Sequence, residues 1–223
     1  MGNTIFQNIK IIIKPALIFI LIMWVVFLIE QLFHLRLNRY GILPRDLNGL
    51  IGIITSPFLH GGLSHIWNNT LPSFFLITAL RTFYQKEAFK IFFLGMLSTG
   101  LLTWLIGRTS YHIGASGIIY MLASFLIFKG LFTKRFKLVA LSFVILFFYG
   151  SLVWYVFPIV KGMSWEGHLS GLISGLVLAL FINVESAPNK KYPWESSNYK
   201  TEDDPFMRQF DAQGNFIELN EEE

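Results

Sequence analysis

Two residues with complementary chemistry, Ser116 and His168, each lie near the start of an apolar stretch. Ser116 stands in the sequence GASG and His168 in GHLSG. A serine hydroxyl is a weak nucleophile until a neighbouring base takes its proton, and histidine suits that task near neutral pH. Glu166 is two residues from His168 and would point to another side of a helix. We therefore expect a Ser116–His168 dyad rather than a triad.

The intermediate of an acyl transfer also needs hydrogen-bond donors aimed at its oxyanion. His65 and Asn69 are four residues apart, so on a helix they share a face. The backbone N–H of Ser116 is a third candidate, because the first N–H groups of a helix have no partner within it. We expect these three donors to bind the oxyanion, and His60 to be a structural residue that holds the neighbouring loop.

The composition places these residues in a membrane protein. The chain is 53% hydrophobic and 14% charged, whereas a soluble domain is usually about 25% charged. It contains no cysteine, which excludes disulfides, thiolate metal sites and a cysteine nucleophile. A helix needs about 20 apolar residues to cross a bilayer, and we expect six such spans, at residues 11–33, 64–83, 89–107, 115–132, 137–158 and 165–184.

The distribution of charge predicts the orientation of these spans. If the N-terminus is cytoplasmic, the inner segments hold 13 Lys and Arg residues and the outer loops hold 5. Cytoplasmic loops carry the excess of Lys and Arg, so we expect a multi-pass protein with both termini cytoplasmic, in a bacterial cytoplasmic membrane. The basic residues lie in short loops between apolar spans and not on one soluble face, so the expected partner is the lipid bilayer and not nucleic acid.

With this topology, every even-numbered span begins at the outer face. His65 and Asn69, Ser116, and His168 should therefore lie at similar depth below that face. Gly167, Gly171 and Gly175 form overlapping small-xxx-small motifs, which let helix backbones approach closely. Packing of span 165–184 on span 115–132, which begins with its own small residues, would bring His168 toward Ser116.

Two further segments complete the predicted organisation. The connection at residues 34–63 is long and rich in Leu and Ile, so we expect it to lie in the outer interface or to pack on the helices. Residues 1–184 form the predicted membrane domain. Residues 185–223 contain ten of the fourteen acidic residues, and we expect them to form a flexible, acidic cytoplasmic tail.

Taken together, these motifs resemble those of the rhomboid intramembrane serine proteases, over residues 11–184. The resemblance rests on H-x4-H-x3-N from His60, on GASG around Ser116, and on GH-x2-G-x3-G from Gly167. It implies an all-α rhomboid fold of six transmembrane helices around a cavity open to the outer face. It also implies hydrolysis of peptide bonds in or near transmembrane segments of membrane-protein substrates, with no metal and no cofactor.

The resemblance further implies individual roles. Ser116 would be the nucleophile, His168 the general base, and His65 and Asn69 the residues that bind the oxyanion. The supporting residues would be Tyr120, which matches the aromatic residue that stacks on the catalytic histidine, together with Gly114, Gly117, Gly171 and His60. Many bacterial relatives carry a Trp-Arg pair in the first outer loop, but residues 40–46 read YGILPRD, so the anchoring of this loop is open.

The same residues have interpretations other than a protease. Ser116 alone could simply serve helix packing, and His112 is most simply a loop residue. His60, His65 and His168 could bind zinc, but no HExxH spacing and no suitably placed acid accompany them. A small transporter would need polar residues near the middle of the membrane, whereas these lie near one face. A rhomboid-like protein that binds client proteins without cutting them is the remaining alternative.

Overall fold

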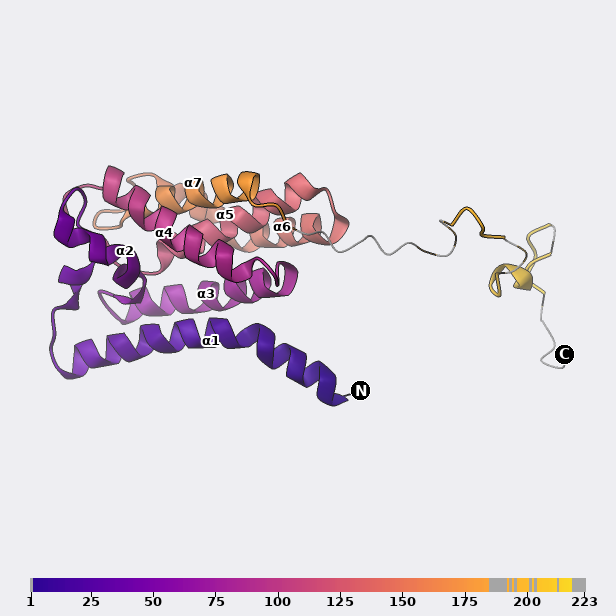
Figure 1. The fold of residues 1–223 in the computed structure, drawn as a ribbon, viewed down its shortest axis with the longest axis horizontal. Helices are drawn as coiled ribbons and strands as arrows, with labels where there is room; N and C mark the ends of the chain where they lie inside the picture. The colour runs from indigo at the N-terminus through magenta and orange to yellow at the C-terminus, as the bar shows by residue number, and fades with distance from the viewer. Residues whose placement is uncertain are drawn as a thin grey trace. The chain divides into compact units, whose positions relative to one another are not determined.

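The computed structural model describes residues 2–184, 192, 194, 196–200, 202, 204–211 and 213–217. The contacts divide the chain into two compact units, Met1–Val184 and Glu185–Glu223. The first unit is a bundle of helices (Figure 1). Its α-helices are α1 (Gly2–Leu32), α2 (Gly52–Thr55), α3 (Leu63–Phe83), α4 (Ala88–Ile106), α5 (Ser116–Thr133), α6 (Phe136–Tyr149) and α7 (Trp165–Phe181).

Short 3₁₀ helices connect these elements. In the first unit they are η1 (Leu37–Tyr40), η2 (Leu47–Ile51), η3 (Ser56–Phe58) and η4 (Gly150–Val156). The described part of the second unit contains η7 (Met207–Gln209) and an antiparallel bridge between Phe210 and Phe216.

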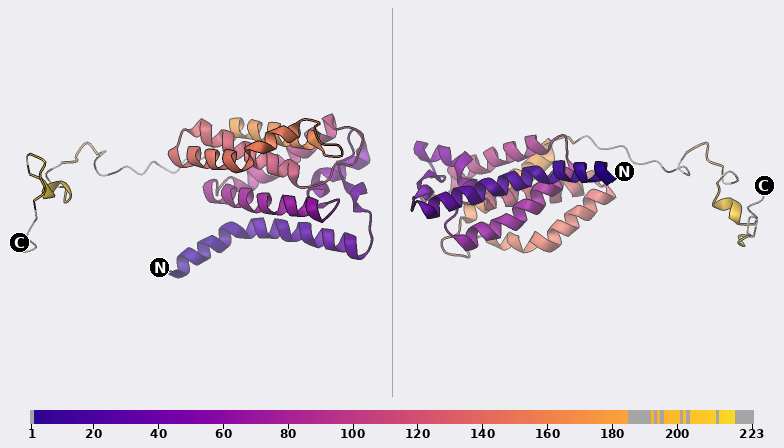
Figure 2. Two further views of the ribbon diagram at one scale, coloured as in Figure 1. Left: turned by 180° about the vertical axis from the view of Figure 1, so that it is seen from behind. Right: turned by 90° about the horizontal axis from the view of Figure 1, so that it is seen from below.

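Helix α5 is the centre of the bundle. It packs against α3, α4, α6 and α7, and all its residues from Ile118 to Leu126 are buried. By contrast, α1 lies beside α3 (Figure 2) and leaves side chains such as Leu21 exposed. Exposed apolar faces of this kind suit contact with lipid. Within the described residues, three helical segments are long and apolar enough to cross a membrane, namely Ile9–Leu32, Ala88–Ile106 and Ser116–Thr133.

Most of the predicted spans agree with the observed helices to within a few residues, but the fifth does not. We expected one helix over residues 137–158, whereas α6 ends at Tyr149 and η4 continues from Gly150 to Val156. Gly150 has a low helix propensity, and Pro158 disfavours helical backbone at the residue before it. The first span is also longer than expected, since α1 begins at Gly2 and contains Pro15; Figure 1 shows α1 bent in its N-terminal half, as expected at a helical proline.

The connection between α1 and α3 packs onto the end of α4. The Arg45 guanidinium donates to the carbonyl oxygens of Leu105 (3.2 Å) and Gly107 (2.7 Å), and the Trp104 indole donates to the Asp46 carbonyl oxygen at 2.8 Å. This connection also pairs with His112 through the Ile42–His112 bridge. The loop that lacks a Trp-Arg pair is therefore anchored by Arg45 and by a tryptophan of α4.

Candidate active site

Ser116 and His168 meet where two central helices begin. Ser116 is the first residue of α5, and His168 lies in the first turn of α7. The Ser116 Oγ and the His168 Nε2 are 2.9 Å apart, which is hydrogen-bond distance. The two residues that the motifs singled out are thus brought together across 52 residues of sequence.

The close approach of α5 and α7 depends on the glycines of α7. A Cβ atom built on Gly171 would collide with the carbonyl oxygen of Gly117, and one built on Gly175 would collide with that of Met121. The Ser124 hydroxyl adds a hydrogen bond across the same interface, to the Leu172 carbonyl oxygen at 2.7 Å. The packing predicted from the small-xxx-small motifs is therefore present.

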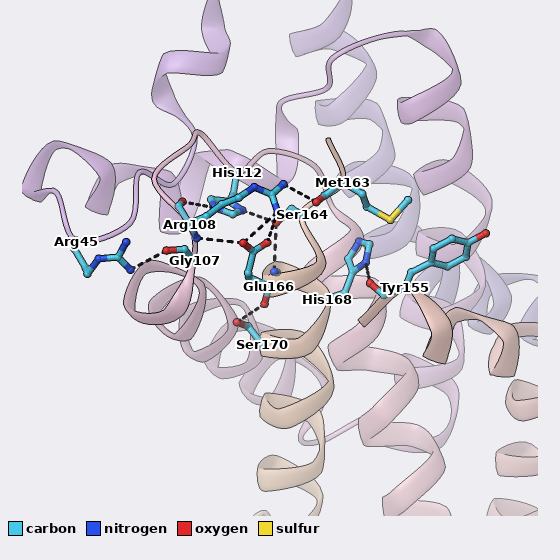
Figure 3. Close-up of polar contacts among 11 residues, drawn as sticks. Arg45, Gly107, Arg108, His112, Tyr155, Met163, Ser164, Glu166, His168 and Ser170 are labelled. Carbon is cyan, nitrogen blue, oxygen red and sulfur yellow. Dashed lines mark hydrogen bonds and ion pairs between the residues drawn. The ribbon is translucent and has the colours of Figure 1, made fainter. Parts of the chain in front are cut away.

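A backbone carbonyl and an aromatic ring orient the imidazole of His168. Its Nδ1 lies 2.9 Å from the carbonyl oxygen of Tyr155 in η4 (Figure 3). Because a carbonyl oxygen only accepts, we assign the proton to Nδ1, which leaves Nε2 free to accept from the Ser116 hydroxyl. The Tyr120 ring stacks on the imidazole, with centroids 4.3 Å apart and 7° between the planes. This tautomer is the one that a general base requires.

His65 and Asn69 lie on α3 beside the backbone that leads to Ser116. A Cβ atom on Gly114 would be 2.6 Å from the His65 Nε2 and 3.6 Å from the Asn69 Nδ2. Gly114 also has a φ of +107°, which side-chain-bearing residues rarely adopt. Both the positive φ and the lack of space for a Cβ atom therefore require glycine here. Its small size lets the two α3 side chains approach the segment that leads to Ser116.

The amide nitrogen of Asn69 is buried without a hydrogen bond. Asn69 is 4% exposed, and its Nδ2 has no hydrogen-bond partner in the structure. A buried donor without a partner is costly, so its presence beside Gly114 is explained if a substrate atom completes the pair. A pocket adjoins Gly114 and Ser116; Ser56, Thr99, Gly117 and Gly167 also line it, whereas His65, Asn69 and His168 do not.

His60 supports this group from the loop that precedes α3. Its ring is 2% exposed and meets the His65 ring edge-on, with centroids 5.0 Å apart. Burial, and next the neighbouring His65, lower the pKa of His60 to about 4. The imidazole of His60 is therefore neutral at neutral pH, as its buried place beside a second imidazole requires.

A polar group that the sequence does not predict lies beside Ser116 and His168. We interpreted His112 as a loop residue, but it is 4% exposed and its ring binds Ser164 and Arg108. Glu166 does point away from His168, as expected, but it pairs with Arg108 instead. No signal in the sequence reveals this group, because Arg108 and Glu166 are 58 residues apart. Among the described residues, no three His, Cys, Asp or Glu side chains are placed to hold a metal ion.

Comparisons with known proteins identify the family of this chain. A family model described as "Rhomboid domain" matches residues 47–184. An uncharacterized protein of Mycobacterium tuberculosis is 38% identical over 189 residues, which cover 78% of this chain and 75% of that protein. An uncharacterized protein of Mycobacterium leprae is 35% identical over 78% of this chain and 72% of its own length.

A more distant relative has the family in its name. This protein, which is named a rhomboid protein, comes from Acanthamoeba polyphaga mimivirus. It is 30% identical to this chain over 162 residues, which cover 69% of this chain and 85% of that protein. The segment that the family model matches contains the start of α3, Ser116 and His168. The chain therefore belongs to the rhomboid family, and it is an integral membrane protein with several apolar helices.

Proposed function

We propose that this protein is an intramembrane serine protease that hydrolyses peptide bonds in or near transmembrane segments of membrane-protein substrates. The observation that carries the proposal is the 2.9 Å contact between the Ser116 Oγ and the His168 Nε2, with the other imidazole nitrogen held by a carbonyl oxygen. Membership of the rhomboid family supports the same reaction class.

The proposed reaction follows the chemistry of these groups. His168 takes the proton of Ser116 as the serine oxygen attacks the substrate carbonyl carbon. The backbone N–H of Ser116 and the side chains of His65 and Asn69 stabilise the oxyanion. His168 then gives the proton to the leaving amine and, in the second half, activates the water that hydrolyses the acyl-enzyme.

The substrate is expected to approach beside α6. The phenylalanines Phe143, Phe147 and Phe148 of this helix are 61%, 83% and 69% exposed. These rings suit contact with lipid and with a transmembrane helix. Because a helix hides its carbonyl groups in backbone hydrogen bonds, the substrate must unwind locally before Ser116 can attack.

The proposed arrangement in the membrane has six spans, α1 and α3 to α7. The excess of Lys and Arg supports a cytoplasmic position for both termini and a position near the outer face for the dyad. The loop between α1 and α3 would lie in the outer interface, which suits its exposed Leu47 (79%) and Ile54 (56%).

Cleavage of a fluorogenic transmembrane-segment substrate by purified protein in liposomes tests the proposal. We expect the wild type to cut it, and Ser116→Ala and His168→Ala to be folded but inactive. Cleavage that survives Ser116→Ala would contradict the nucleophile. A folded wild type that cuts none of several such substrates would contradict the protease and favour client binding or transport.

A further inference from the structure

A charged pair that the reaction above does not use lies beside the dyad. Glu166 is 1% exposed and sits in the first turn of α7. The Nη1 of Arg108 lies 3.2 Å from one of its carboxylate oxygens and 3.1 Å from the other. The backbone N–H of Arg108 donates to the same carboxylate at 3.2 Å (Figure 3). A buried carboxylate thus has three hydrogen bonds from one residue.

Arg108 also holds the loop that leads into α7. Its Nη2 donates to the carbonyl oxygen of Met163 at 2.6 Å. Arg108 lies in the segment that leads to Ser116, whereas Met163 and Glu166 lie just before His168. This single side chain therefore ties together the two segments that carry the dyad.

His112 makes a second link between these segments. Its Nε2 is 3.0 Å from the Arg108 carbonyl oxygen and its Nδ1 is 2.5 Å from the Ser164 hydroxyl. Since the carbonyl only accepts, Nε2 carries the proton and Nδ1 accepts from Ser164. Ser164 is the N-cap of α7 and accepts from the Gly167 N–H at 3.3 Å. Burial lowers the pKa of His112, which favours this neutral form.

We propose that Arg108, Glu166, His112 and Ser164 form a polar clamp that sets the distance between Ser116 and His168. These four are positioning residues, because their hydrogen bonds reach neither the Ser116 Oγ nor the His168 imidazole. The glycine contacts of α7 with α5 fix the helices further along their length, and the clamp fixes their outer ends. This inference rests on the proposed function, since it assigns the clamp to the same hydrolysis.

The test separates positioning from folding with a double variant. Loss of Arg108 alone would leave a buried carboxylate unpaired, which destabilises a protein strongly, whereas replacement of both partners by apolar residues is often neutral. Arg108→Met combined with Glu166→Met should therefore keep the wild-type melting temperature. Arg45→Met is the matched control, because Arg45 binds the same end of α4 but no residue of α7.

The readout is the covalent labelling of Ser116 by a fluorophosphonate, which needs an activated serine but no protein substrate. We expect the double variant to label about 10- to 100-fold more slowly at saturating probe, the scale for a misplacement of about 1 Å, with unchanged probe affinity. Arg45→Met should label like the wild type. If the double variant keeps both the wild-type melting temperature and the wild-type rate, the clamp is only structural and the proposal is wrong.

Two further outcomes decide the remaining cases. If the double variant does not fold, Arg108→Lys tests the clamp instead. This variant keeps a cation beside Glu166 but loses the several hydrogen bonds that the guanidinium group donates. Slower labelling of the folded Lys variant supports the clamp, and labelling at the wild-type rate overturns it. Absence of Ser116 labelling in the wild type would instead overturn the proposed function itself, and this inference with it.

Discussion

At the scale of single residues, the site combines an imidazole that two neighbouring groups hold in place with a buried amide that lacks a hydrogen-bond acceptor. His168 is held by the Tyr155 carbonyl oxygen and by the Tyr120 ring, so its free nitrogen points at Ser116. By contrast, the buried amide nitrogen of Asn69 has no hydrogen-bond partner, and neither do the two ring nitrogens of His60. Such an amide donor is what an oxyanion that exists only during the reaction would need.

The role of Asn69 can be tested by a single substitution. Asn69→Ala should lower turnover by about 100- to 1000-fold, the scale for the loss of one oxyanion donor, with little change in KM. Asn68→Ala is the control, because Asn68 is exposed on the same helix and should leave turnover unchanged. Steady-state cleavage kinetics measure both. An Asn69→Ala variant with wild-type turnover would make this residue structural.

At the scale of elements, the contact between α5 and α7 determines whether the dyad exists. Gly171→Ala would place a methyl group against the Gly117 carbonyl oxygen and the Tyr120 side chain. Overpacking typically destabilises a protein by about 1–3 kcal/mol, so we expect a lower melting temperature. The two helices would also have to separate, so we expect cleavage to be at least about tenfold slower.

The control for this substitution is Gly150→Ala at the start of η4. A Cβ atom on Gly150 would meet nothing within 4 Å, and its φ of −61° suits alanine. We expect Gly150→Ala to keep the wild-type activity and melting temperature, or to raise the latter slightly. If the two substitutions change the activity and the melting temperature equally, the α5–α7 contact does not determine the geometry of the dyad.

The elements also show what the sequence alone can predict. Spans bounded by polar residues were predicted to within a few residues for α3, α4, α5 and α7, because apolar length determines them. The position of His65 and Asn69 on one face of α3 could also be predicted, because residues four apart on a helix are neighbours. The end of α6 could not be predicted from the sequence, because the apolar run continues through the 3₁₀ turns of η4. The Arg108–Glu166 pair could not be predicted, since only the packed fold brings these residues together.

At the scale of the whole molecule, the distribution of charge and the position of the site make one consistent prediction. Of the 14 Lys and Arg residues in residues 2–184, five lie at the end of the bundle that contains the dyad, and the other nine lie toward the opposite end. If the positive loops are cytoplasmic, hydrolysis takes place near the outer face and both termini are inside.

This topology can be measured directly, because the chain has no cysteine. Asn48→Cys in the connection between α1 and α3 and Gln85→Cys between α3 and α4 each introduce one exposed thiol. A membrane-impermeant maleimide should label the Asn48→Cys variant in intact cells and the Gln85→Cys variant only after the membrane is opened. The reverse pattern would place the dyad on the cytoplasmic side.

The most direct test of the central claim is to locate a fluorophosphonate adduct by mass spectrometry. Our account predicts that the wild type in liposomes forms one adduct, on Ser116, and that folded His168→Ala does not, because its serine lacks a base. An adduct on Ser116 that forms equally fast in His168→Ala would contradict the dyad. A folded wild type without any adduct would contradict the proposal that this rhomboid protein is a protease.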